Sequence, residues 1–181
     1  MTDVPITQGF AYLTSIVPTG TPLTISGANI GSGGNTVRIV AKASDEDLQA
    51  EIPVNLQVPQ TNFETAANTI RLRFMKKCNK SFTVTGLIKN ETIGADSTTR
   101  ENYRDILENY VQEGNSGKVL YLVIPKVLTP SAETATSVYQ YPSGTNGLKG
   151  LILKLKITEN DTSKLNDRFE VILTFQVGVD F

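Results

Sequence analysis

The C-terminal end of the chain reads Phe169-Glu170-Val171-Ile172-Leu173-Thr174-Phe175-Gln176-Val177-Gly178-Val179-Asp180-Phe181. Its odd positions are apolar throughout, and its even positions are mostly polar. A period of two residues predicts a β-strand with one buried face and one largely solvated face. This is the clearest pattern in the chain, and it indicates a fold built mainly from strands.

A second strand is predicted just upstream, because leucine and isoleucine at 151, 153, 155 and 157 alternate with Ile152, Lys154, Lys156 and Thr158. The two strands are separated by Glu159-Asn160-Asp161-Thr162-Ser163-Lys164, a run of residues typical of a turn. We therefore expect a long terminal hairpin over residues 148–178.

The same alternation predicts further strands at residues 23–25, 37–40, 52–58, 70–74 and 82–89. Segment 52–58 contains Pro53 and is followed by Pro59, which favours an edge strand or an extended arm because proline cannot donate to a sheet ladder. Residues 119–124 are apolar at every position, as expected of a central strand covered on both faces.

One segment has the helical period, with a single apolar stripe formed by Tyr103, Ile106, Leu107, Tyr110 and Val111. Thr98 and Glu101 have the spacing of a capping box, and Gly114 can close the last turn. We expect an amphipathic helix over about 98–112 that packs its stripe onto the sheet. The predicted fold class is thus an antiparallel β-sandwich or barrel with one flanking helix.

Three stretches lack a clean period, and no domain boundary is visible. They are an N-terminal arm (about 1–20), a turn at Gly31-Ser32-Gly33-Gly34-Asn35 and a Pro/Ser/Thr/Gly-rich loop (about 125–147). Loops as long as 125–147 are uncommon in compact domains and usually serve a partner or an inserted function. We expect one β-rich domain, 1–181.

The composition argues against an enzyme. The chain has no histidine and one cysteine, so the commonest general base, the commonest metal ligand and any intramolecular disulfide are absent. We expect no catalytic residue, no metal and no cofactor. An enzyme built on two carboxylates is the remaining catalytic alternative, since any two acidic residues can meet in a fold.

Motifs that bind ions or phosphate are also incomplete. Ser44-Asp45-Glu46-Asp47 lacks the central Gly and final Glu of a calcium loop, which favours a solvated loop or a helix start. The glycine-rich run 27–34 leads into a strand, whereas a phosphate cradle opens a helix. With 17 basic and 18 acidic residues, the net charge of −1 excludes strong electrostatic binding of nucleic acid.

Membrane segments are not expected. Met1-Thr2-Asp3-Val4-Pro5 lacks the basic and apolar regions of a signal peptide, and the longest apolar run, 119–124, is far shorter than a membrane span.

The order strand 81–89, helix 98–112, strand 118–124, loop and hairpin 148–178 resembles the tail tube proteins of tailed bacteriophages and related contractile injection systems. The segments that carry the resemblance are Ser81-Phe82-Thr83-Val84-Thr85-Gly86-Leu87-Ile88, ahead of the helix, and Lys156-Ile157-Thr158-Glu159 with Asn166 to Phe175 at the end. The resemblance covers about residues 69–181. It implies six copies to a ring, with rings stacked into a hollow tube that serves as a conduit for DNA.

The partners implied are therefore copies of the chain itself and other tail or virion proteins, with DNA only in passage and no membrane anchor. The implied location is the virion tail, after synthesis in the host cytoplasm. Candidate residues for contacts between subunits are aromatic and apolar residues of the arm and the long loop: Phe10, Tyr12, Ile16, Tyr139 and Tyr141.

Two alternatives remain open. The first is another virion component, such as a tail terminator, baseplate or head-decoration protein. The second is a β-sandwich that binds a receptor or carbohydrate, in which Tyr139 and Tyr141 would stack against the ligand.

Overall fold

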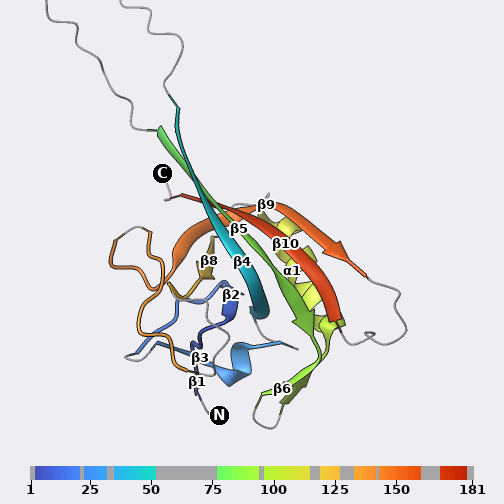
Figure 1. Ribbon diagram of the computed structural model, residues 1–181. Coiled ribbons are helices and arrows are strands. Elements are labelled where there is room, and N and C mark those ends of the chain that lie inside the picture. The colour runs from blue at the N-terminus through green and yellow to red at the C-terminus, as the bar shows by residue number, and fades with distance from the viewer. Residues whose placement is uncertain are drawn as a thin grey trace, which may run out of the picture.

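In the computed structural model of the protein, six antiparallel strands close into a barrel in the order β10-β5-β4-β2-β8-β9 (Figure 1). The structure describes residues 3–20, 23–31, 35–51, 77–93, 96–114, 119–126, 133–141, 143–159 and 168–178. The barrel strands are β2 (Phe10–Thr14), β4 (Thr36–Glu51), β5 (Lys77–Lys89), β8 (Leu120–Val123), β9 (Leu148–Thr158) and β10 (Arg168–Val177). The expected mainly-β fold with a single helix is confirmed among these residues.

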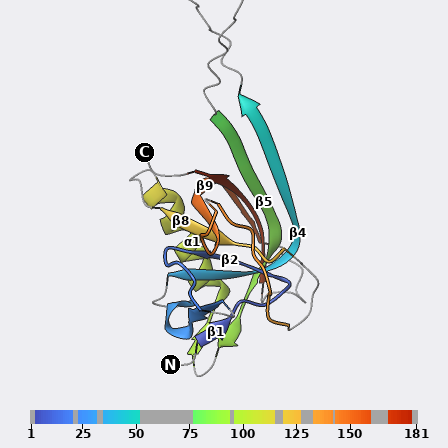
Figure 2. The same cartoon turned by 90° about the vertical axis from the view of Figure 1, so that its left-hand side faces the viewer.

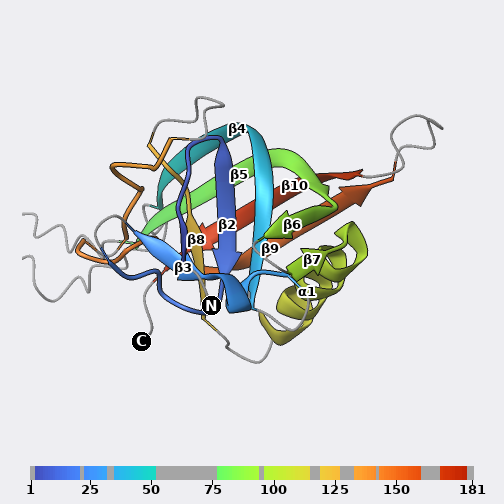
Figure 3. The same cartoon turned by 90° about the horizontal axis from the view of Figure 1, so that it is seen from below.

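Shorter elements lie at one end of the barrel (Figure 3). β1 (Asp3–Pro5) pairs with β3 (Thr24–Ser26), and β6 (Glu91–Ile93) pairs with β7 (Asp96–Thr98). A 3-10 turn, Gly27–Asn29, follows β3, and α1 (Arg100–Gly114) follows β7. The short β6–β7 hairpin had no signal in the sequence pattern.

The terminal hairpin forms as expected, with β9 and β10 paired from Glu170↔Thr158 to Val177↔Gly150. A bulge interrupts it, because Thr174 pairs with Lys154 while Phe175 pairs with Ile152, which leaves Leu153 without a partner. One extra residue reverses which side chains face inward. Leu155 and Ile157 therefore pack against the core, whereas Leu151 and Leu153 are exposed, so the predicted common face of these four residues is divided.

The barrel interior is filled by large apolar side chains. Each strand contributes its inward-facing positions, and on β10 these are the odd residues of the predicted pattern. Fully buried side chains of this size stabilise a fold by about 1.5–3 kcal/mol each. The largest of them include Tyr12, Tyr103, Phe82, Phe175, Leu13, Ile39 and Leu122.

The helical stripe packs as predicted over most of its length. Tyr103, Leu107 and Tyr110 are buried, and Ile106 is partly buried against the same core. Val111 at the end of the stripe remains exposed. The helix lies beside β9 and covers the barrel where β8 does not reach (Figure 3).

The helix begins two residues later than expected and is capped differently. The Asn102 N–H donates to Thr99 Oγ1 (3.2 Å), and the Arg100 N–H donates to Asn90 Oδ1 (2.8 Å). Glu101 instead accepts a hydrogen bond from Arg100 Nε (2.7 Å), a contact that also lowers the pKa of the Glu101 carboxyl. The predicted capping box of Thr98 and Glu101 is thus wrong, since Thr98 is the last residue of β7 and is buried.

Thr99→Ala tests this assignment. Loss of an N-cap hydroxyl costs about 1 kcal/mol, so we expect a drop of about that size in the free energy of unfolding, measured by urea titration. Ser97→Ala, an exposed hydroxyl on β7, is the matched control and should be close to neutral. Equal losses for the two variants would contradict the cap.

Residues 10–14, which lie within the predicted irregular arm, form a strand of the barrel. β2 pairs with β4 on one side and with β8 on the other, from Phe10↔Val40 to Thr14↔Thr36 and from Tyr12↔Val123 to Thr14↔Tyr121. Residues 10–14 are apolar on both faces, as a strand covered on both sides requires, so a strict alternation is absent.

The acidic run 44–47 is also strand, not loop or helix start. It belongs to β4, where Asp45 pairs with Thr83 and Asp47 with Ser81. The predicted strands at 52–58 and 70–74 lie outside the described residues.

The described part of the 125–147 loop is fastened to the barrel by backbone hydrogen bonds. Ala135 N donates to Ile6 O (2.7 Å), Lys126 N to Ser137 O (3.0 Å) and Tyr139 N to Ile124 O (2.9 Å). Ala135 and Val138 of this segment are themselves buried. This segment forms no named strand, but it packs along the barrel wall.

Candidate interaction surface

The four longest strands form one continuous antiparallel sheet in the order β4-β5-β10-β9. β4 turns away from β2 after Ala41, whose N–H donates to Gly9 O (3.0 Å), and its later described pairings are all with β5. These pairings continue to Glu51↔Lys77, whereas β10 follows β5 only as far as Lys80. β4 and β5 therefore extend beyond the barrel as a two-stranded ribbon (Figures 1 and 2).

The sheet has two edges that lack a strand partner among the described residues. One is β4 from Lys42 to Glu51. The other is β9 from Leu151 to Thr158, because β8 pairs only with Leu148, Lys149 and Gly150. Unpaired strand edges offer rows of backbone donors and acceptors to another chain.

A groove runs alongside the β9 edge. Its volume is about 400 Å³, and it separates β9 from α1. Leu153, at the bulge, is 64% exposed there, and Val111 of α1 is exposed on the opposite wall. Lys154 and Lys156 are exposed on the same stretch of β9. The groove is lined by apolar side chains of β9 and α1 together with Lys154 and the Arg104–Glu108 ion pair of α1, and the backbone edge of β9 beside it has no strand partner among the described residues.

The outward face of the sheet is rich in hydroxyl groups and also carries the exposed side chains of Leu151 and Ile172. Thr83 Oγ1 and Thr174 Oγ1 share a hydrogen bond (3.3 Å), and Gln176 Nε2 donates to Lys80 O (3.0 Å). Lys42 Nζ pairs with Glu170 Oε1 at 3.1 Å in an exposed position. These contacts order the side chains of the sheet surface. The Lys42–Glu170 pair is exposed and does not lie in a pocket.

The most buried ion pair among those of the described residues lies at the end of the barrel, beneath α1. Arg38 Nη2 of β4 contacts Glu91 Oε2 of β6 at 2.9 Å, and the two side chains are 19% and 8% exposed. The Tyr103 hydroxyl donates to Glu91 Oε1, and the Arg38 guanidinium stacks on the Phe10 ring with Cζ 4.1 Å from its centroid. Burial and the Glu91 carboxylate raise the pKa of Tyr103 well above its usual range. The phenol therefore stays protonated and ties α1 to the barrel rather than acting as a base.

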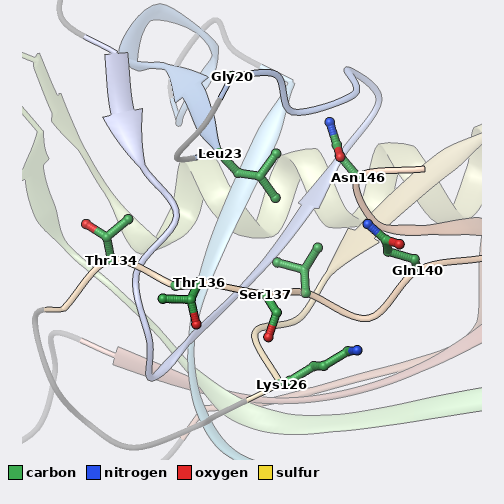
Figure 4. A pocket seen from close by; sticks show the side chains of 10 residues that line it. Gly20, Leu23, Lys126, Thr134, Thr136, Ser137, Gln140 and Asn146 are labelled. Carbon is green, nitrogen blue, oxygen red and sulfur yellow. The ribbon is translucent and has the colours of Figure 1, made fainter. Parts of the chain in front are cut away.

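A shallow pocket of about 670 Å³ lies between the β3 region and the 134–140 segment (Figure 4). Leu23 lies on one side of it, and Lys126, Ser137 and Gln140 lie on the other (Figure 4). Asn146 at its rim donates through Nδ2 to Pro18 O (2.8 Å). Lys126 is the one ionisable group among the described lining residues, so the pocket offers hydrogen bonds but no proton-transfer pair.

The structure separates the five predicted contact residues. Tyr12 is fully buried between β4 and β8, so its expected role between subunits is wrong; its hydroxyl instead bonds Thr7 Oγ1 (3.0 Å). Phe10 is half-buried beneath Arg38, and the Tyr139 ring packs on Phe82 with centroids 5.3 Å apart. Ile16 and Tyr141 are exposed, and their role between subunits stays a prediction. The predicted set missed the β9 edge and its groove.

Among the described residues, no group of three His, Cys, Asp or Glu side chains is placed to hold a metal ion. No helix in this part of the chain is both long enough and apolar enough to cross a membrane.

The chain matches no known family model and no curated protein sequence. The fold and the site together define a six-stranded β-barrel protein in which the β4–β5 ribbon projects beyond the barrel and two strand edges have no partner in the described part of the chain.

Proposed function

We propose that this chain is a structural virion protein that assembles with copies of itself into stacked rings, six copies to a ring, forming the tail tube of a phage or related injection system. The observation that carries the proposal is the pair of edges that lack a strand partner among the described residues, β4 from Lys42 and β9 from Leu151, at opposite sides of one sheet.

Strand direction supports a ring. Each neighbouring pair in β4-β5-β10-β9 is antiparallel, so β4 and β9 run in opposite directions. A second copy placed beside the first in the same orientation brings its β4 antiparallel to β9, and the alternation continues across the joint. Such a contact joins two different surfaces, so it is repeated from copy to copy and closes into a ring when the rotation permits.

The outward face of the sheet suits passage of DNA without retention. Its described central residues on β5 and β10 are Ser81, Thr83, Thr85, Ile172, Thr174 and Gln176, none of which is charged, and the net charge of the chain is −1. Tight binding of DNA requires several cation–phosphate contacts, which these residues do not supply.

Assembly can be tested directly with the purified chain. We expect rings or tubes in negative-stain electron micrographs and a concentration-dependent mass in light scattering. A strictly monomeric species at high concentration would count against the proposal. In a purified particle, a tube protein should be among the most abundant bands, whereas a terminator or baseplate protein should be scarce.

Leu153→Asp tests the edge. Because Leu153 is 64% exposed, the monomer should keep its melting temperature. Burying a leucine at a joint is worth about 1.5–3 kcal/mol, so we expect the concentration for half-assembly to rise about tenfold or more.

Ile172→Asp is the matched control, since Ile172 is exposed on the same sheet but lies on β10, away from either edge. Equal effects of the two variants on assembly would contradict a joint at β9.

A further inference from the structure

We propose that the pocket between the β3 region and the 133–141 segment of the long loop binds a saccharide that carries a carboxylate. In this site the Lys126 ammonium pairs with the carboxylate, and neutral side chains bond the sugar hydroxyls. None of the described lining residues belongs to β4 or β9, so the inference does not depend on the proposed assembly through those strands.

The pocket has the size of a site for a small organic molecule. Its volume is about 670 Å³, and such sites in proteins measure roughly 300–1,000 Å³. Leu23, which is half-buried, gives the pocket apolar surface on one side. Thr134 lies toward one end, and Gln140 and Asn146 lie toward the other (Figure 4). The pocket is therefore larger than a single ion or water molecule requires.

The polar side chains that line the pocket are mostly neutral and can both donate and accept hydrogen bonds. Their hydroxyl and amide groups match the hydroxyls of a sugar, each of which also donates and accepts. Asn146 is already oriented, because its Nδ2 donates to Pro18 O (2.8 Å) and its Oδ1 is left as an acceptor. These neutral residues are Thr134, Thr136, Ser137, Gln140 and Asn146.

Backbone hydrogen bonds hold the walls of the pocket in place. Ile6 connects the two sides, because its N–H donates to Leu23 O (2.9 Å) and its carbonyl accepts from Ala135 N (2.7 Å). Lys126 N donates to Ser137 O (3.0 Å), which fixes the base of the lysine side chain beside that serine. A site whose backbone is ordered before binding loses less entropy when the ligand binds.

The same bonds disfavour a peptide that binds by adding a strand. Strand addition requires a row of free backbone donors and acceptors. Along the 133–141 segment, backbone groups are bonded to residues 6–8 on one side and to residues 124–126 on the other. Recognition in the pocket therefore falls to side chains, which suits a sugar better than an extended peptide.

Lys126 determines the charge of the ligand. It is the one ionisable group among the described lining residues, it is exposed, and it forms no ion pair with another described residue. Glu133 is the nearest acidic residue along the segment, but it does not line the pocket. One ammonium matches one carboxylate, whereas a nucleic acid requires several cations.

Binding is measured by NMR titration of the isotopically labelled chain with two acidic sugars, methyl β-glucuronide and a methyl sialoside. Methyl β-glucoside is the matched neutral sugar, because it differs from the glucuronide only in a hydroxymethyl group that replaces the carboxylate. We expect amide shifts at residue 126 and residues 134–140. At least one acidic sugar should bind about tenfold more tightly than the glucoside, which is the effect of one hydrogen bond to a charged group.

Three variants assign the contacts. Lys126→Gln should abolish the preference for the acidic sugar, so that it binds as weakly as the glucoside. Gln140→Ala removes a neutral hydrogen bond and should weaken both sugars about fivefold. Lys89→Gln, at an exposed lysine of β5 that does not line the pocket, is the matched control and should change neither. Unchanged melting temperatures show that the variants are folded.

The inference is overturned if neither acidic sugar binds, or if the preference for the acidic sugar survives Lys126→Gln. It is also overturned if N-acetyl-dialanine, a peptide with a free carboxylate, binds while the sugars do not, because the pocket then takes a peptide terminus. Electron microscopy tests assembly separately. A chain that forms rings but binds no sugar contradicts only this inference, and a chain that binds sugar but stays monomeric contradicts only the proposed function.

Discussion

Glu91→Ala is expected to lower the free energy of unfolding by about 3–5 kcal/mol, the cost of removing one partner from a buried ion pair. Glu91 is the acceptor for both Arg38 and the Tyr103 hydroxyl. Its loss leaves the Arg38 guanidinium charged in a site where Nε already has no partner among the described residues. Urea denaturation followed by circular dichroism measures the change.

Two further variants separate the causes of this loss. Glu91→Gln keeps an acceptor for Tyr103 but removes the charge that faces Arg38, so we expect an intermediate loss. Glu108→Ala breaks an arginine–glutamate pair with a shorter contact, Arg104 Nε to Glu108 Oε1 at 2.7 Å, but that pair is exposed. Exposed pairs contribute little, and this control should cost far less than Glu91→Ala.

Replacement of the whole cluster by apolar residues is expected to destabilise the fold less than removal of Glu91 alone. Arg38→Met, Glu91→Leu and Tyr103→Phe together remove all the polar groups, and buried ion pairs can often be exchanged for apolar residues without loss. We expect the triple variant to be more stable than Glu91→Ala. A triple variant that is less stable than Glu91→Ala would contradict this expectation. It would show that the polar contacts of the cluster make a net contribution to stability, beyond cancelling the cost of burying its charges.

Much of the fold could be predicted because hydrophobic period reports directly on secondary structure. The odd residues of β10 and the stripe at Tyr103, Leu107 and Tyr110 are buried as the pattern predicts. The failures arise where tertiary contacts override the pattern. β2 is apolar on both faces and so shows no period, and the bulge at Leu153 shifts the inward face of β9 by one residue.

The candidate surface was less predictable, because whether a strand edge has a partner depends on how all the strands are arranged in the fold. No single segment of the sequence carries that information. Alternation identifies β9 as a strand but does not say that β8 accompanies it only to Gly150. The Arg38–Glu91–Tyr103 cluster was missed for a similar reason. Its members lie on β4, β6 and α1, and Arg38 occupies a position that alternation assigns to the solvated face.

Gly150→Ala should destabilise the barrel at the point where it closes. Gly150 pairs with Val177 of β10 and with Leu120 of β8, so this residue joins the long sheet to the rest of the barrel. A methyl group here would lie 1.9 Å from the Gln176 carbonyl oxygen and 2.9 Å from Phe175 Cε1. Backbone atoms cannot rotate away as a flexible side chain does, so β9 and β10 must separate.

Overpacking of this kind costs about 3 kcal/mol, which for a chain of this size lowers the melting temperature by about 6–12 °C. Gly178→Ala is the matched control, because no heavy atom lies within 4 Å of the added methyl group and its φ is not in the left-handed region. It should leave the melting temperature nearly unchanged. If the two variants had the same melting temperature, the close approach at Gly150 would not be the cause of the change. The entropy of the unfolded chain, which every glycine-to-alanine change alters, would then account for it. A selective effect at Gly150 would instead show that the joint between β8, β9 and β10 tolerates no side chain, which explains why glycine occupies a position that otherwise faces the core.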